Sequence, residues 1–115
     1  METVLPHMVL NLPKARIPLA GATGYVLQGA DCQTVFLHFS RDTEVPIHTH
    51  GDSWGVVLAG EIELNVDGRK QHLARGDQFF VPAGTPHGAF IHAGYTAMEI
   101  FAGRDRWQLR DQQDG

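Results

Sequence analysis

The chain has 115 residues, which is enough for one domain with a buried core and too few for two. Nine Lys and Arg residues against thirteen Asp and Glu residues give a formal charge of -4, and the basic residues form no cluster beyond Arg69-Lys70, so we expect no nucleic-acid partner. A single cysteine, Cys32, excludes an internal disulfide. The first twenty residues lack the apolar core of a signal peptide, and no apolar stretch approaches the roughly 18 residues of a membrane span. We therefore expect a cytoplasmic protein with no membrane partner.

Short segments rich in β-branched and aromatic residues follow one another along the chain, separated by polar or glycine-containing turns. The predicted strands lie within residues 24–30, 32–40, 54–60, 61–66, 77–91 and 95–103. Asp67-Gly68 is a strong hairpin signal after the fourth segment. Only residues 104–113 have a helical pattern. Eight or so strands with no long helix between them predict an all-β fold, an antiparallel β-sandwich or barrel, with a short C-terminal helix.

Two histidines, His48 and His50, stand one residue apart just before an apolar strand. Successive side chains of a strand point to opposite faces, so the pair shares one side, about 7 Å apart along the chain, close enough to bind one ion. A lone strand histidine is more often structural than a ligand, and pairs at this spacing also arise by chance. A second segment, residues 76–87, ends a strand at Pro82, turns at a glycine and delivers His87. These three histidines are the candidate metal ligands.

The two histidine segments resemble the paired motifs of the cupin superfamily, which consists of small β-barrels with a double-stranded β-helix fold. The second motif is matched by Gly76, Pro82, Gly84 and His87, with Ile91 in place of its final asparagine. The first motif is matched by His48, His50 and Gly60, with Asp42 in place of its leading glycine. The resemblance implies a barrel over residues 24–102. It leaves residues 1–23 as an N-terminal segment at a dimer contact and residues 103–115 as a tail or short helix.

The sequence departs from the family motif where a Glu or Gln is expected, because Ser53 stands there. A hydroxyl is a poor ligand for a divalent ion, and Asp52, which strict alternation from His50 would place on the ligand side, is a possible replacement. Gly51 could break that alternation, so both residues remain candidates for an extra ligand or a pocket position. Three imidazoles leave open positions on one divalent ion, which could be Fe, Mn, Ni or Zn. The alternative is a cupin that has lost its metal.

Glu99 lies in the segment Tyr95 to Gly103, where Ala97, Glu99 and Phe101 share one face. If that face is the barrel interior, Glu99 is a catalytic base near the ion, with Phe101 beside it in the pocket. An outward-facing glutamate is an equally good interpretation. The available apolar wall residues for the pocket are Phe36, Phe79, Phe90, Met98 and Phe101, and alternation leaves open which of them point inward.

The resemblance to cupins implies a metal-dependent enzyme of the dioxygenase or isomerase/lyase type that acts on a small carbonyl or carboxylate compound. A sensor-like cupin that binds a small molecule without turning it over is the second hypothesis. We also expect a homodimer, because the runs Val56–Leu58 and Phe79–Val81 are apolar on both faces of their strands and one small barrel buries only one face.

Overall fold

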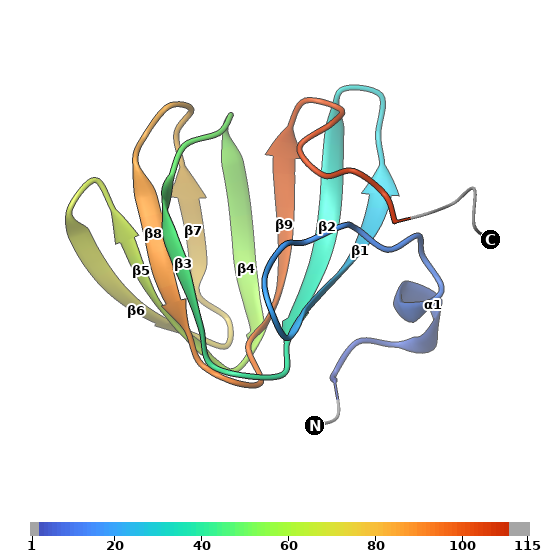
Figure 1. Ribbon diagram of the computed structural model, residues 1–115, viewed down its shortest axis with the longest axis horizontal. Helices are drawn as coiled ribbons and strands as arrows, with labels where there is room; N and C mark the ends of the chain where they lie inside the picture. The colour runs from blue at the N-terminus through green and yellow to red at the C-terminus, as the bar shows by residue number, and fades with distance from the viewer. Residues whose placement is uncertain (1–2, 111–115) are drawn as a thin grey trace.

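The computed structural model describes residues 3–110, and the strands in this part of the chain form two antiparallel sheets that face each other (Figure 1). The five-stranded sheet has the order β1-β2-β9-β4-β7, and the four-stranded sheet has the order β3-β8-β5-β6. The strands are β1 (Ala22–Gln28), β2 (Cys32–Phe39), β3 (Thr43–His48), β4 (Ser53–Ala59), β5 (Glu61–Val66), β6 (Arg69–Ala74), β7 (Gln78–Val81), β8 (His87–Ile91) and β9 (Thr96–Ala102). The predicted all-β sandwich is confirmed, with its strands between Ala22 and Ala102.

The core lies between the sheets and follows the two-residue period of the strands. In β2 every second side chain is buried, namely Gln33, Val35, Leu37 and Phe39, and the residues between them face outward. The other sheet contributes Ile62, Leu64 and Ile91 from β5 and β8 to the same core. The alternation therefore decides, strand by strand, which side chains reach the interior.

Two turns contain the backbone conformations that glycine favours. Asp67 (φ 51°) and Gly68 (φ 82°) join β5 to β6, and two positive φ values in succession are typical of a tight type I′ hairpin, as predicted from this pair. Gly60 (φ 74°) joins β4 of one sheet to β5 of the other. A Cβ atom there would lie 2.6 Å from the Cα atom of Tyr95, so the crossing between the sheets requires glycine.

The terminal segments pair with each other beside β1 (Figure 1). The Arg16 N–H donates to the Gln108 carbonyl oxygen at 2.7 Å, and the Arg110 N–H donates to the Lys14 carbonyl oxygen at 2.7 Å. Residues 103–110 therefore contain no helix, and for these residues the predicted C-terminal helix is wrong, because their backbone groups are engaged by the N-terminal segment. Residues 111–113 of that prediction lie outside the described residues.

One short helix, α1 (His7–Leu10), precedes the first strand and had no counterpart in the prediction. Among residues 3–110 no helix is long and apolar enough to cross a membrane.

Candidate functional site

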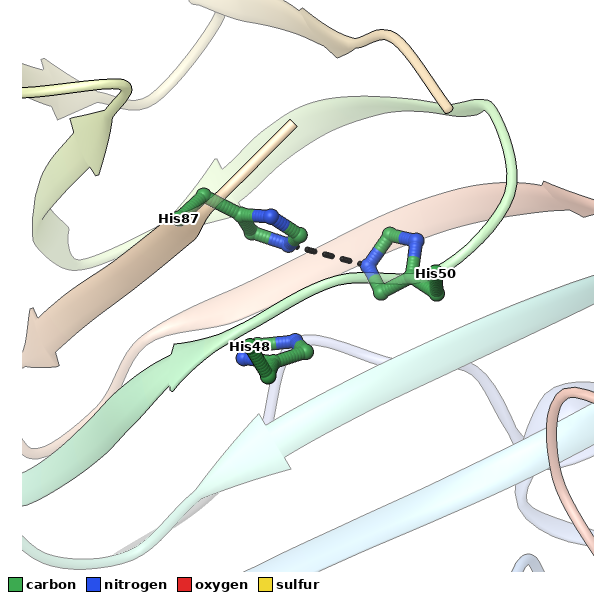
Figure 2. A group of neighbouring side chains, drawn as sticks. All are labelled: His48, His50 and His87. Carbon is green, nitrogen blue, oxygen red and sulfur yellow. Dashed lines mark hydrogen bonds between the residues drawn. The ribbon is translucent and has the colours of Figure 1, made fainter. Parts of the chain in front are cut away.

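The three predicted histidines lie together at one end of the sandwich (Figure 2). His48 ends β3, His87 begins β8, and these two strands pair so that His48 stands opposite His87. His50 follows two residues after β3, and its ring centroid lies 4.5 Å from that of His87 and 5.3 Å from that of His48. One nitrogen of each ring lies within 4.8 Å of the others, so the three side chains could hold a metal ion. No other group of this kind occurs among residues 3–110.

Each of the three rings has a backbone carbonyl oxygen next to its Nδ1 atom. The oxygens are those of Pro46, 2.9 Å from His48, Gly51, 2.7 Å from His50, and Thr85, 2.9 Å from His87. A carbonyl oxygen only accepts, so each Nδ1 carries the proton and donates it. The Nε2 atom of each neutral ring is then left with a free lone pair, which is the arrangement of metal-binding histidines whose orientation a hydrogen-bond acceptor fixes.

The Nε2 atoms of His50 and His87 lie 2.9 Å apart (Figure 2). With both Nδ1 atoms protonated, two lone pairs face each other at this distance unless a proton or a cation lies with them. Burial lowers the pKa of both imidazoles, which disfavours the extra proton. Two nitrogens that each lie about 2.1 Å from one ion, at a right angle, are about 3.0 Å apart. A divalent cation therefore fits these residues.

A cavity of about 350 Å³ opens between the two sheets next to the histidines. Its wall is mostly apolar and includes Phe79 and Phe101, as predicted, and also Phe39. The structure also decides the orientation of the other three candidate wall residues. Phe36, Met98 and Phe90 lie outside the cavity lining, because their positions in β2, β9 and β8 alternate with those of the inward-facing residues.

Ser53 and Asp52 have different positions at the start of β4. Ser53 is 3% exposed and lines the cavity, opposite Phe101 in the neighbouring strand β9. The Asp52 carboxylate accepts a hydrogen bond from the Ala83 N–H at 2.7 Å and is absent from the cavity lining and from the histidine cluster. The alternation does break between His50 and β4, so the hydroxyl and not the carboxylate faces the interior.

Glu99 points into the cavity, on the same side of β9 as Phe101. Gly55, its cross-strand neighbour, makes room for it, because a Cβ atom at that position would lie 2.9 Å from Glu99 Cγ and would also collide with the Phe79 ring. Burial raises the pKa of the Glu99 carboxyl to about 7, and the positive charge of Arg106 opposes part of that rise. Glu99 is therefore a carboxylate that titrates near neutral pH inside an apolar cavity.

Among the cavity residues that were not predicted from the sequence, three have polar side-chain groups: Tyr95, Arg106 and Trp107. Arg106 and Trp107 belong to the segment after β9 that was interpreted as a tail. The guanidinium carbon of Arg106 lies 4.1 Å from the Trp107 ring centroid and 5.5 Å from that of Phe101. The signal in the sequence was an arginine soon after Glu99 and Phe101, and this spacing does not indicate where the segment folds.

Comparisons with known proteins agree with this architecture. The family model described as Cupin domain matches residues 35–102. A quercetin 2,3-dioxygenase of Bacillus subtilis (strain 168) is 39% identical over 106 residues, which cover 76% of this chain and 31% of that protein. The chain thus spans less than a third of this curated relative.

Two solved structures are similar over nearly the whole chain. An RmlC-like cupin from Shewanella frigidimarina NCIMB 400 has a TM-score of 0.75 and 26% identity, covering 92% of this chain and 95% of that one. KdgF from a Halomonas species has a TM-score of 0.74 and 24% identity, covering 92% and 96% of the two chains. At such identity the KdgF likeness concerns the fold alone.

Proposed function

The chain belongs to the cupin family, and on that basis we propose that it is a metal-dependent enzyme that acts on a small carbonyl or carboxylate compound. The reaction is of the dioxygenase or the isomerase/lyase type. The observation that carries this proposal is the convergence of three imidazole nitrogens, within 4.8 Å of one another, beside a cavity that also contains Glu99. The dioxygenase type takes further support from the relative in Bacillus subtilis, whose name describes that activity.

His48, His50 and His87 would hold one divalent ion, which could be Fe, Mn, Ni or Zn. Bound there, the ion would polarise a carbonyl group or attract an anionic oxygen. Ser53 stands where many cupins have a carboxylate ligand, so the protein contributes no negative charge at that position. We infer that the substrate supplies the missing oxygen ligand and charge.

Glu99 is proposed as the general base. A carboxyl group with a pKa of about 7 is partly deprotonated at neutral pH and can take a proton and return it. For a substrate with a C–H bond next to a carbonyl group, Glu99 would accept the proton while the electron pair of that bond moves toward the carbonyl oxygen. Return of the proton to a different carbon completes an isomerisation with no net gain or loss of atoms.

The decisive experiment uses protein purified without an affinity tag and measures bound metals by elemental analysis. Two reactions are then followed: oxygen consumption with quercetin, and exchange of deuterium from the solvent into the C–H group next to the carbonyl of 2-oxobutanoate. We expect one of them to depend on the metal, to disappear in His87→Ala together with the metal, and to slow in Glu99→Gln while the metal stays bound. A Glu99→Gln variant with unchanged turnover would remove the residue from the mechanism.

Two alternatives remain within the same family. A bound metal without either reaction would favour a cupin that binds a small molecule without turning it over. A protein with no more than a trace of transition metal would favour a cupin that has lost its metal. A cytoplasmic location and the exclusion of nucleic acid as a partner stay predictions.

We also propose that the chain forms a homodimer through the outer face of the five-stranded sheet. Two neighbouring rows of side chains cross all five strands on that face and carry no charge. They are Leu27, Thr34, Ile100, Trp54 and Phe80 in one row, and Tyr25, Phe36, Met98, Val56 and Gln78 in the other. A face about 20 Å wide without a charged group suits a second copy of the same surface better than a polar partner.

Phe80 and Phe90 offer a matched test of the dimer, because they are 55% and 37% exposed on the outer faces of different sheets. We expect light scattering at micromolar concentration to give a dimer mass for the unaltered chain and for Phe90→Glu. Phe80→Glu should give a monomer mass. A monomeric unaltered chain would refute this interface.

A further inference from the structure

The buried polar side-chain atoms without a hydrogen-bond partner all belong to residues of the cavity lining, and two of them belong to the neighbouring residues Arg106 and Trp107. Within residues 3–110 they are Tyr95 Oη, Arg106 Nε and Trp107 Nε1, and all three residues line the cavity next to the histidines. Nearly all buried polar groups in folded proteins have a partner, so three unsatisfied groups at a single cavity indicate hydrogen bonds that a ligand completes.

Arg106 is the most informative of the three, because its charge also lacks a partner. No carboxylate lies within ion-pair distance of Arg106 in the part of the chain that the structure describes, where the ion pairs found all join a histidine to a glutamate. Its guanidinium instead lies over the Trp107 ring. Glu99, the only acidic residue of the cavity lining, influences Arg106 electrostatically without forming an ion pair. Burial removes water from the Arg106 guanidinium and so lowers its pKa. The guanidinium nevertheless stays charged.

We propose that Arg106 binds a carboxylate group of the substrate, so that the enzyme takes small carboxylic acids whose other end lies at the histidines. Phe101 connects the two ends of the site, because its ring centroid is 5.3 Å from the His50 ring and 5.5 Å from the Arg106 guanidinium carbon. The apolar part of such a substrate would lie along Phe101. This inference deepens the proposed function by naming the substrate class, and it rests on that function only for the chemistry at the histidine end.

The chemistry of the subsite favours a carboxylate over a phosphate. The cavity lining contains one guanidinium and no lysine or second arginine, so it supplies a single full positive charge away from the histidines. The planar fork of N–H donors on a guanidinium matches the two oxygens of a carboxylate. The free N–H of Trp107, whose ring lies beside the guanidinium, adds an uncharged donor, whereas a phosphate dianion would require further charge.

The test compares levulinate, which has a carboxylate at one end and a ketone near the other, with its uncharged methyl ester. Calorimetric titration of the unaltered protein should show at least about tenfold tighter binding of levulinate, equivalent to 1.4 kcal/mol. In Arg106→Gln the two compounds should bind within about twofold of each other, and Arg106→Lys should keep part of the preference. Arg104→Gln is the matched control, because it removes the same charge two residues away, from an exposed side chain that donates to the Ala30 carbonyl oxygen at 2.8 Å.

Equal binding of acid and ester by the unaltered protein, or an unchanged preference in Arg106→Gln, would overturn the proposal. If Arg104→Gln lost the preference for levulinate over its ester to the same extent, the preference would be a general effect of charge, which would also overturn the proposal. If Arg106→Gln fails to fold, Arg106→Lys replaces it, and both Arg106→Lys and its reference protein also carry Trp54→Phe. Trp107 is then the remaining tryptophan, and its fluorescence emission reports binding beside Arg106. There, an emission response to levulinate that Arg106→Lys leaves unchanged would refute the subsite.

The titrations are made with metal-free and with Mn²⁺-loaded protein. A preference that depends on Arg106 and persists without metal supports the subsite even if the proposed enzyme activity fails. A preference that appears only with metal and ignores Arg106 places the carboxylate at the ion and refutes the subsite, while leaving the metal centre intact.

Discussion

Two groups of histidines in this protein differ in what surrounds them. In the inner group, His48, His50 and His87 have backbone carbonyl oxygens at Nδ1 and no carboxylate partner. In the outer group, on the exposed face of the four-stranded sheet, His72 and His92 both contact the same carboxylate oxygen. The oxygen Oε2 of Glu63 lies 2.7 Å from His72 Nδ1 and 2.9 Å from His92 Nε2.

The partners give the two groups opposite electrostatics. Burial lowers the pKa of His50 and His87, whereas the hydrogen bond to Glu63 raises the pKa of His72. The His50 and His87 rings therefore favour the neutral form, and the free lone pair of each suits a metal ion. In the outer group His72 favours the proton, and its ion pair with Glu63 lies in solvent, where such pairs contribute little. Histidine alone does not indicate a metal site; its acceptors and neighbours do.

The largest expected effect is on metal binding. His87→Ala should weaken Mn²⁺ or Zn²⁺ binding by about a hundredfold or more, because it removes one of three nitrogen ligands. His92→Ala, which removes a histidine of the outer group, should leave the affinity unchanged. Calorimetric titration with either metal checks both variants. Equal losses in the two variants would mean that the inner group is not the metal site.

Glu99 in the cavity and Glu63 in the outer histidine group should affect the pH dependence of stability in opposite directions. The measurement is urea unfolding of metal-free protein at several pH values. The pKa of Glu99 rises from its usual 4.5 to about 7 in the folded state, so the folded protein binds more protons than the unfolded chain in this window. Stability should therefore fall as the pH rises from about 4.5 to 7 and stay low above it. Glu99→Gln should remove this loss and stabilise the protein by about 2 kcal/mol at pH 8, with little effect at pH 4.

Glu63→Gln is the control for that measurement. Its hydrogen bonds to His92 and His72 lower the pKa of Glu63, which is the opposite direction. The contribution of Glu63 to the free energy of unfolding is therefore present above the unfolded pKa of Glu63 and is lost as the pH falls through its folded pKa. Glu63→Gln should therefore not stabilise the protein at pH 8. A Glu99→Gln variant without the gain at pH 8 would show that the Glu99 carboxylate is solvated.

A third variant supplies the inner group with the carboxylate that the outer group already has. Ser53→Glu should strengthen Mn²⁺ binding by about tenfold, equivalent to 1.4 kcal/mol, because an anionic oxygen joins three neutral nitrogens. Ser53→Gln controls for size without charge. If tighter binding comes with faster turnover, Ser53 is a degenerate ligand. If turnover falls, the open position serves the substrate.

The smallest effect is expected in the outer group. His72→Gln should remove a stabilising contribution that is fully present below the unfolded pKa of 6.5 and disappears as the pH rises through the raised folded pKa. Because the pair is exposed, the shift in the melting temperature at pH 6 should be smaller than that of Glu99→Gln at pH 8, and it should be absent at pH 9. A large shift would show that the outer ion pairs are structurally important.

Much of the site could be predicted because it depends on spacing within strands and turns. The convergence of His48 and His50 with His87 was expected from the resemblance to the paired cupin motifs, and the hairpin at Asp67-Gly68, which depends on local turn residues, was confirmed. The position of Ser53 was harder, since the chain between His50 and β4 leaves the strand geometry and shifts the alternation by one residue. The helix predicted after β9 failed because backbone groups of Gln108 and Arg110 bond to a segment more than ninety residues earlier in the chain.

The sequence by itself indicated most of the strands, although not Thr43–His48, and the alternation within each, because these follow from a two-residue period and from turn residues that act locally. The three histidines were identified through their resemblance to the cupin motifs. Only the tertiary structure decided which face is enclosed. It turned Glu99 into a buried carboxylate, left Phe36 and Met98 on the outside and brought Arg106 and Trp107 over the end of the cavity. Burial and charge pairing depend on neighbours that are distant in sequence, and these neighbours give a glutamate or an arginine its chemistry.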